Sequence, residues 1–220
     1  MDGLLVGIVI PALNEAGTIA RVVTAIARQG TCFVVDDGST DATAELARAA
    51  GAIVVRHPKN LGYDAALDSG FRQAAQAGCQ RIITLDADGQ HDPDLVNVFL
   101  SKLETADVVL GVRHRRARLA EDVFSWYTRY RWGILDPLCG LKGYRTDVYL
   151  ALGHFDSYGS IGTELMLFAA SSGRIVEQVP FKVHERRGQP RFGRRLAANL
   201  KIFRALLLSS WLLPRKVFRC

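Results

Sequence analysis

The sequence predicts an α/β fold built on a mostly parallel sheet, and three observations support this prediction. Short apolar runs rich in Val and Ile alternate with longer segments of helical pattern. A chain of 220 residues is long enough for one domain with helices on both faces of a sheet. The apolar share of 49% and the charged share of 23% are those of an ordinary globular protein.

The alternation of strands and helices is regular in the first half of the chain. We expect strands over Leu4–Ile10, Cys32–Val35, Ile53–Val55, Arg81–Leu85 and Val108–Gly111, because each is a short apolar, mostly β-branched run. We expect helices near Glu15–Arg28, Asp41–Ala50, Tyr63–Ala77 and Pro93–Leu103, where apolar residues recur with helical spacing. Asn14 and Asp41 stand where helix N-caps are expected.

The second half of the chain is less regular. Helices are expected over Glu121–Trp132 and near Gly162–Ser172, and a strand over Arg174–Pro180. Polar clusters follow three strands of the first half, at residues 11–15, 36–41 and 86–92. Ligands of open α/β sheets bind outside the carboxyl ends of the strands, so these clusters predict a site at one edge of the sheet.

The segment from Thr84 to Pro93 carries the most chemical information. If it is extended, side chains two residues apart point the same way, so Asp86, Asp88 and Gln90 share one side. Three oxygen donors there favour a hard cation, Mg²⁺ or Mn²⁺, over zinc, and such an ion suits a diphosphate ligand. The alternative is a solvated acidic loop, in which Asp92 is the N-cap and Pro93 the first residue of the next helix.

A second acidic pair, Asp36 and Asp37, directly follows the second predicted strand. A carboxylate in this place can accept hydrogen bonds from the ribose or base of a nucleotide. The alternative is a capped turn, with Gly38 at the bend and Asp41 as the cap. One cap does not require both Asp36 and Asp37, which favours nucleotide contact for at least one of them.

The charge is unevenly distributed along the chain. Residues 185–220 hold ten Lys or Arg and one acid, a net charge of +9, whereas the other 184 residues hold 18 bases and 21 acids, a net charge of −3. The basic end therefore predicts a local anionic partner. Nucleic acid is not expected, because the bases lack interleaved aromatic residues and the rest of the chain is acidic. The four cysteines form no CxxC pair, which favours a reducing, cytoplasmic location.

Four ordered motifs resemble those of family 2 glycosyltransferases. They are Ile10-Pro-Ala-Leu-Asn-Glu15, Val35-Asp-Asp-Gly-Ser-Thr-Asp41, Asn60-Leu-Gly62 and Asp86-Ala-Asp-Gly-Gln-His91. Two further segments, Gly111-Val-Arg113 and Asp136-Pro-Leu-Cys-Gly-Leu-Lys-Gly-Tyr-Arg145, look like the dolichyl- or polyprenyl-phosphate mannose and glucose synthases. The resemblance covers roughly residues 5–192. It implies the A-type (GT-A, Rossmann-like) nucleotide-diphospho-sugar transferase fold, with a catalytic domain over residues 1–193.

The resemblance also implies roles for particular residues. Pro11, Glu15, Asp36 and Asp37 would line the nucleotide pocket, and Asp86, Asp88 and Gln90 would bind Mg²⁺ or Mn²⁺ and the diphosphate. Leu13 and Asp64 depart from the common family pattern, which leaves the donor base and sugar open.

The implied reaction is an inverting transfer of a sugar from a nucleoside diphosphate to polyprenyl (undecaprenyl or dolichyl) phosphate. The acceptor phosphate is already an anionic nucleophile, so cations must hold it and no general base is needed. Arg113 matches the Gly-x-Arg motif and is expected to act in catalysis with Asp86 and Asp88. Arg186, Arg187 and Arg191 lie in a late basic loop and are the other phosphate candidates.

Two alternatives to this function remain open. In the first, the same fold transfers sugar to a hydroxyl of a glycan or glycolipid in cell-surface polysaccharide synthesis. Glu164 or another acid would then be the base, although an acid in a first helical turn, such as Glu164, is also explained by the helix dipole. In the second, the chain is an inactive nucleotide-binding subunit of a membrane complex. The complete Asp86, Asp88 and Gln90 set argues against this.

Residues 194–220 are expected to form a basic amphipathic segment at the membrane interface. Leu196, Leu200, Phe203, Leu207 and Trp211 share one helical face, and basic residues cluster opposite. No apolar run reaches the roughly 18 residues of a membrane span. An interfacial helix on anionic lipid, on the inner face of the cell membrane, fits this pattern. The alternative is a helix that closes the core or contacts a small membrane protein or a second copy of the chain.

Overall fold

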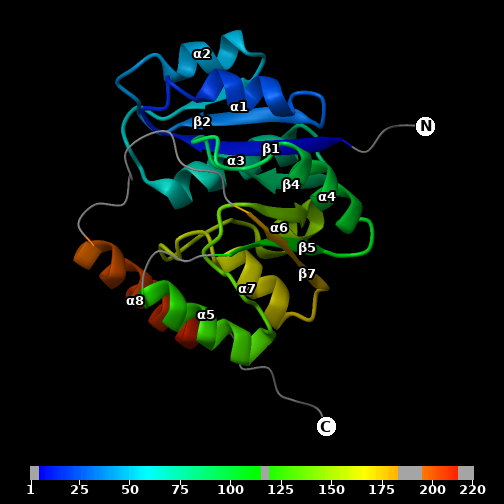
Figure 1. Cartoon of the computed structure of the whole chain (residues 1–220), viewed down its shortest axis with the longest axis vertical. Coiled ribbons are helices and arrows are strands. Elements are labelled where there is room, and N and C mark those ends of the chain that lie inside the picture. The colour runs from blue at the N-terminus through cyan, green and yellow to red at the C-terminus, as the bar shows by residue number, and fades with distance from the viewer. Residues whose placement is uncertain (1–4, 115–118, 183–194, 213–220) are drawn as a thin grey trace.

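The chain forms one mixed sheet with helices on both faces (Figure 1). This computed structural model describes residues 5–114, 119–182 and 195–212. The strands in these ranges are β1 (Val6–Ala12), β2 (Thr31–Asp36), β3 (Ile53–Arg56), β4 (Arg81–Thr84), β5 (Val108–Arg113), β6 (Lys142–Arg145) and β7 (Val176–Phe181). The helices are α1 (Ile19–Ile26), α2 (Thr43–Ala49), α3 (Tyr63–Gln76), α4 (Asp94–Lys102), α5 (Leu119–Trp132), α6 (Thr146–Leu152), α7 (Glu164–Ser171) and α8 (Arg195–Leu212).

The predicted α/β class is confirmed, and each predicted element is present with somewhat different ends. The largest difference is at α1, which begins at Ile19 rather than near Glu15. Asn14 has a left-handed φ of 51°, and the chain turns so that Thr18 N and Ile19 N both donate to the Glu15 carbonyl. The helix can begin only after this turn.

Of the two predicted N-caps, Asn14 is wrong, whereas Asp41 makes the contact expected of a cap, because Thr43 N at the start of α2 donates to its Oδ1 (3.0 Å). The N-cap positions of α1, α2 and α4 are Thr18, Ala42 and Pro93, and none of them makes a side-chain cap hydrogen bond. Asn14 and Asp41 also connect two loops: Thr40 N donates to Asn14 Oδ1 (2.9 Å), and Ala16 N donates to Asp41 Oδ2 (3.1 Å). These polar residues therefore join the loops after β1 and β2.

The order of the strands places an unpredicted strand in the middle of the sheet. The order is β3-β2-β1-β4-β6-β5-β7, and β6 runs antiparallel to both β4 and β5. Strand β6 was not predicted, because Lys142-Gly-Tyr-Arg145 has no apolar run. Helix α6, which follows it, was not predicted either. Since β6 is reversed, its first residue, Lys142, lies at the edge of the sheet where the neighbouring parallel strands end.

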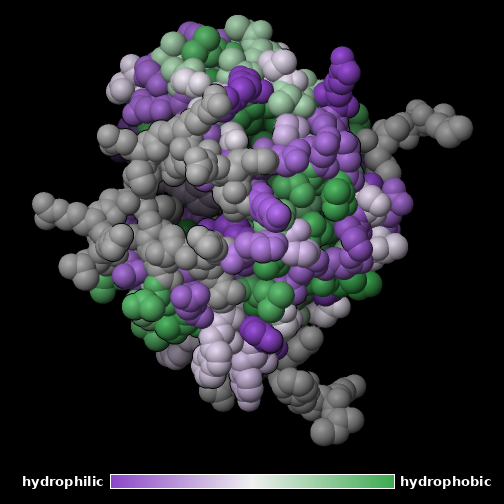
Figure 2. Space-filling view, viewed as in Figure 1, coloured by the Kyte–Doolittle hydropathy of each residue, from purple (hydrophilic) through white to green (hydrophobic). Residues whose placement is uncertain are grey.

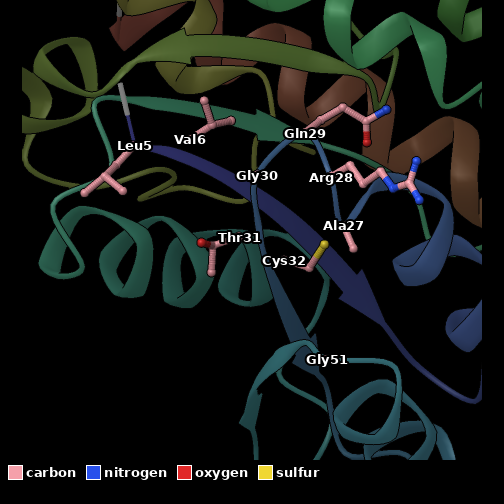
Figure 3. Close-up of a pocket in the computed structure, with 9 residues that line it drawn as sticks. All are labelled: Leu5, Val6, Ala27, Arg28, Gln29, Gly30, Thr31, Cys32 and Gly51. Carbon is pink, nitrogen blue, oxygen red and sulfur yellow. The ribbon is translucent and has the colours of Figure 1, made fainter. Parts of the chain in front are cut away.

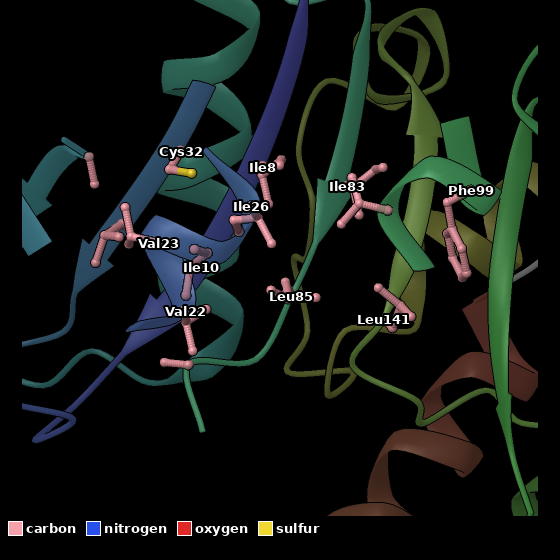
Figure 4. Packing of buried hydrophobic residues seen from close by; sticks show 14 of the residues in the cluster. Ile8, Ile10, Val22, Val23, Ile26, Cys32, Ile83, Leu85, Phe99 and Leu141 are labelled. Atoms are coloured by element: carbon pink, nitrogen blue, oxygen red, sulfur yellow. The ribbon is translucent and has the colours of Figure 1, made fainter. Parts of the chain in front are cut away.

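Two cores separate along the sheet because side chains alternate between its faces. Ile8 and Ile10 of β1 pack with α1 and α4 on one face, as Figure 4 shows, with Val22 and Ile26 of α1 against them. Val9, between them in the sequence, packs on the other face with residues of α3 and α5. All of these strand residues have fully buried side chains.

Helix α8 packs against α5 at one end of the domain (Figure 1). Ile202 and Ala205 of α8 are buried in the second core. The buried face is therefore not the apolar stripe predicted from the sequence, since Leu200, Leu207 and Trp211 of that stripe are exposed. Within the described ranges, no helix has the length and apolar character needed to span a bilayer.

Candidate active site

The carboxyl ends of β1, β2 and β4 and the amino end of β6 meet at one edge of the sheet. Ala12 pairs with Asp36 across β1 and β2, and Val9 of β1 pairs with Thr84 of β4. Thr84 in turn pairs with Lys142 of β6. The polar segments after β1, β2 and β4 therefore share an edge, as the sequence predicted.

Asp36 and Asp37 hold the loops around this edge. Asp36 is fully buried; Ser39 N donates to its Oδ1 (2.9 Å), and Arg56 Nε lies 3.2 Å from its Oδ2. Asp37 accepts hydrogen bonds from Leu61 N (2.9 Å) and Gly62 N (2.8 Å). Both carboxylates thus order the nearby backbone, and their contact with a nucleotide stays a prediction.

A buried histidine that the sequence reasoning missed supports Asp37. His57 Nδ1 lies 2.7 Å from Asp37 Oδ1, and His57 Nε2 lies 2.9 Å from Ser69 Oγ on α3. The hydrogen-bonded series Asp37–His57–Ser69 therefore connects the end of β2 to α3. His57 is 7% exposed, and both of its ring nitrogens have partners within the protein, so it positions Asp37.

The other two predicted nucleotide residues lie at the end of β1 and in the loop after it. Pro11 is a buried residue of β1, and Glu15 is half-buried. Glu15 N donates to Thr43 Oγ1 (2.8 Å), and the Thr18 hydroxyl donates to Glu15 Oε2 (2.8 Å). The loop is thereby fixed against α2, and a role for Pro11 and Glu15 in nucleotide binding stays a prediction.

The Asp86 carboxylate lies directly over the Cα atom of Gly140. A β-carbon on Gly140 would be 2.2 Å from Asp86 Oδ2 and 2.6 Å from Asp86 Oδ1, closer than any real contact. Thr84 fixes the glycine loop in place: its hydroxyl donates to the Gly140 carbonyl (2.6 Å) and accepts from Lys142 N (3.1 Å). The absence of a side chain at Gly140 is what makes room for Asp86.

Asp88 and Gln90 follow in a turn rather than in an extended segment. Strand β4 ends at Thr84, and Gly89 has a φ of 73°, so the expectation that alternation places three side chains on one side is wrong. Instead, Gln90 N donates to Asp88 Oδ1 (3.0 Å), and Asp88 is 8% exposed. A tight turn therefore brings Asp88 and Gln90 near the end of the strand.

The predicted cation ligands have the chemistry of a site for a hard divalent cation, and metal binding by them stays a prediction. Asp86, Asp88 and Gln90 offer carboxylate and amide oxygens, which Mg²⁺ and Mn²⁺ prefer. Within the described ranges, no group of three or more His, Cys, Asp or Glu side chains is arranged to hold an ion. A site with two carboxylates suits Mg²⁺, which is usually bound through one or two carboxylates together with substrate phosphates.

Lys142 is a buried cation beside these carboxylates that the sequence reasoning did not single out. Its Nζ donates to the Gly162 carbonyl (2.5 Å), and the residue is 4% exposed. Burial lowers the pKa of Lys142 to about 8, although the nearby charges of Asp136, Asp64 and Asp86 oppose this shift. The segment Lys142-Gly-Tyr-Arg145 has no apolar run, so the sequence pattern did not place Lys142 on a strand at the site.

Arg113 is half-buried and forms an ion pair with the fully buried Asp136 carboxylate, which the sequence did not predict. Its Nε donates to Asp136 Oδ2 (2.8 Å) and its Nη2 to Asp136 Oδ1 (2.9 Å), while Glu121 Oε2 lies 3.3 Å from Nη2. Burial lowers the pKa of Arg113, but the hydrogen bonds and charge of Asp136 outweigh it and hold this pKa above its usual value. The guanidinium fork is thus used within the protein, and acceptor binding by Arg113 stays a prediction.

Some of the predicted phosphate ligands cannot be placed. Arg186, Arg187 and Arg191 lie outside the described residues. The alternative base, Glu164, is 7% exposed and accepts hydrogen bonds from Ser157 N and the Ser157 hydroxyl. His154 Nε2 lies 3.0 Å from its Oε1. Through these contacts Glu164 holds the loop before α7 in place, which is a structural role.

Two cavities lie on opposite edges of the sheet. A cavity of about 320 Å³ borders Asp86, Gly89 and Arg21 at the site edge. Another, of about 410 Å³, is lined by Val6, Thr31 and Cys32 at the amino ends of β1 and β2 (Figure 3). Ligands of such sheets bind at the carboxyl edge, which favours the first cavity as part of the site.

Asp64, on α3, makes the stability of this region depend on pH. Gly162 N donates to its Oδ1 (2.6 Å) and Ile161 N to its Oδ2 (3.3 Å). Burial and then the negative charge of Asp156 raise the pKa of Asp64 to about 6. Because this pKa lies above the ordinary value of 3.8, the favourable contribution is complete below about pH 4 and is lost as the pH rises through about 6.

We therefore expect Asp64→Asn to raise the free energy of unfolding above pH 6 and to change it much less near pH 4, since asparagine has no charge to bury. Urea unfolding of both proteins across this range measures the difference. A difference that is the same at every pH, or that grows towards acid, would contradict the assignment.

Carboxylates gather at the carboxyl edge of a mostly parallel sheet, which is where open α/β proteins bind their ligands. The chain belongs to glycosyl transferase family 2, whose sequence profile matches residues 7–156. This confirms the resemblance noted in the sequence.

Relatives and solved structures agree with this family. An uncharacterized glycosyltransferase of Mycobacterium bovis is 33% identical over 189 residues, which cover 80% of this chain and 84% of the relative. The undecaprenyl-phosphate mannosyltransferase of Micrococcus luteus is 29% identical over 203 residues, covering 81% and 83%. The fold is similar to glucosyl-3-phosphoglycerate synthase from Mycobacterium tuberculosis in complex with Mn²⁺ and UDP-glucose, with a TM-score of 0.77, 26% identity and coverage of 97% and 81%.

Proposed function

We propose that this enzyme transfers a sugar from a nucleoside diphosphate to a polyprenyl phosphate, with Mg²⁺ or Mn²⁺ as cofactor. The observation that carries the proposal is the pair of carboxylates, Asp86 and Asp88, at the carboxyl edge of the sheet of a family 2 glycosyltransferase. The relative from Micrococcus luteus, named for an undecaprenyl-phosphate acceptor, supports the choice of acceptor.

In this reaction, different residues would bind the cation, the nucleotide and the acceptor phosphate. Asp86, Asp88 and Gln90 would hold the cation, which when bound neutralises charge on the departing diphosphate. Asp36, Asp37, Pro11 and Glu15 would form the nucleotide pocket. The acceptor phosphate is an anion at neutral pH and needs cations rather than a base. Arg113, Arg186, Arg187 and Arg191 are the proposed cations.

A second candidate is transfer to a hydroxyl group. The solved structure of a glucosyl-3-phosphoglycerate synthase favours it, because that enzyme's name describes a sugar joined to a small phosphorylated acid. A hydroxyl acceptor requires a base, and Glu164 is already hydrogen-bonded to Ser157. The lipid-phosphate reaction avoids this requirement and is preferred.

The proposed location is the inner face of the cell membrane, with the enzyme bound peripherally. Two facts support it: the net charge of +9 in residues 185–220, and the lipid acceptor named for the relative. A small membrane-protein partner or a second copy of the chain is the alternative to direct lipid contact.

The test is an assay with the full chain, undecaprenyl phosphate, Mn²⁺ and radiolabelled UDP-glucose or GDP-mannose. We expect label to enter the organic phase, and Asp88→Asn to reduce it by about 100-fold or more, because a ligand of the cation is lost. Arg145→Ala, which removes only an exposed ion pair with Asp147, is the control and should keep activity. Label found only on 3-phosphoglycerate or another hydroxyl acceptor would overturn the proposed acceptor.

A further inference from the structure

Large apolar side chains gather on the outer faces of α5 and α8, which pack side by side. Those on α5 are Val123, Trp126 and Tyr130, and those on α8 are Phe203, Leu207 and Trp211, all exposed. Because α5 and α8 are in contact, these two groups of apolar side chains lie at the same end of the molecule (Figure 1). Figure 2 shows a cluster of hydrophobic side chains at the lower left, where α5 and α8 lie in Figure 1, with paler side chains beside it. We call these six residues the α5/α8 face.

The opposite sides of both helices already close the core. Phe124 of α5 and Ile202 and Ala205 of α8 are buried, so the α5/α8 face is not needed to hold the helices in place. Trp126 and Tyr130 are 71% and 79% exposed, and their rings stack with centroids 6.3 Å apart. Exposed apolar patches of this kind mark surfaces that bind another apolar phase.

The tryptophan and tyrosine residues of the α5/α8 face indicate that it binds the interface of a lipid membrane. Each ring has an apolar body and a polar N–H or O–H group, a combination enriched at the level of lipid headgroups. Exposed bases accompany them: Arg129 on α5 and Lys201 and Arg204 on α8, of which Arg204 also donates to the Tyr158 carbonyl (2.9 Å). Asp122 is an exposed acid on α5, whereas α8 has no acid along its length. Basic and aromatic residues together complement an anionic membrane surface.

We propose that the α5/α8 face docks on an anionic lipid bilayer, with the aromatic rings in the headgroup region. The same face is a poor match for a second copy of the chain, because a two-fold dimer would bring like-charged bases together. This inference rests on the proposed function, because an enzyme that uses a lipid acceptor must reach that lipid at the membrane. It also adds α5 to the surface that the sequence placed in the C-terminal segment alone.

Vesicle flotation of the full chain tests the proposal. We expect it to float with vesicles of phosphatidylcholine and phosphatidylglycerol in equal parts, to float poorly with phosphatidylcholine alone, and to be released by salt. Trp126→Ser with Tyr130→Ser should weaken vesicle binding about tenfold or more without changing Tm, because both rings are exposed. Leu150→Ser, which alters an exposed apolar residue on α6, is the matched control and should bind as the wild type does.

Three results would overturn the proposal: no flotation of the wild type with anionic vesicles, equal flotation of the double variant, or a dimer that the double substitution dissociates. The activity assay separates this inference from the proposed function. With undecaprenyl phosphate dissolved in detergent, the double variant should keep its activity. An inactive wild-type protein that still binds vesicles would refute the proposed function and leave the docking surface intact.

Discussion

Adding one methyl group to Gly140 is expected to reduce activity about 10- to 100-fold while leaving the fold intact. In Gly140→Ala the new β-carbon would overlap both carboxylate oxygens of Asp86. The Asp86 side chain is half-exposed and can rotate away, so the overlap should displace the carboxylate rather than unfold the protein. A loss of this size is typical when the support of a metal ligand is removed.

Two measurements detect the displacement of the Asp86 carboxylate. They are kcat/KM for sugar transfer and calorimetry of nucleoside diphosphate binding with Mn²⁺. Gly17→Ala is the matched control, since its β-carbon would meet no atom within 4 Å. In an Asp86→Ala background, the Gly140 substitution should have almost no further effect, because the group it displaces is already gone. Full additivity of the two losses would show that Gly140 acts through something other than Asp86.

Removing the Asp136 carboxylate is expected to lower the free energy of unfolding by about 1.5–3 kcal/mol, the range for hydrogen bonds to charged groups, because it leaves the half-buried Arg113 guanidinium without its main partner. The Asp136 side chain is fully buried, and it accepts from Arg113 through both the side chain and the backbone N–H (3.1 Å). Urea unfolding of Asp136→Ala measures the loss. Arg145→Ala, at an exposed ion pair, should cost at most about 1 kcal/mol.

The same experiment separates two functions of Arg113. If the residue is mainly structural, Arg113→Ala should be destabilised to a similar degree as Asp136→Ala. If it mainly binds the acceptor phosphate, Arg113→Ala should retain most of its stability and lose activity through a higher KM for the acceptor. A stable Asp136→Ala protein would contradict the structural assignment.

The class of fold and the position of the site followed from the sequence because both depend on local patterns. The apolar runs of β1, β2 and β4 predict buried parallel strands without knowledge of their neighbours. Polar residues after those runs must lie at the carboxyl edge, whatever the order of the strands. Asp36 and Asp86 were therefore placed at the correct edge from their positions in the chain.

The contacts within the site depend on residues far apart in the chain, so local patterns do not predict them. Asp86 and Gly140 are brought together by β6, a strand of four residues whose lysine and glycine have no strand pattern. Arg113 meets Asp136 across a helix and a loop. For α8, spacing predicts an apolar stripe but not whether it faces the core. Only packing against α5 decided that Ile202 is buried and Trp211 exposed. Sequence periodicity describes one element at a time, whereas the partners of a side chain depend on which elements the fold makes neighbours.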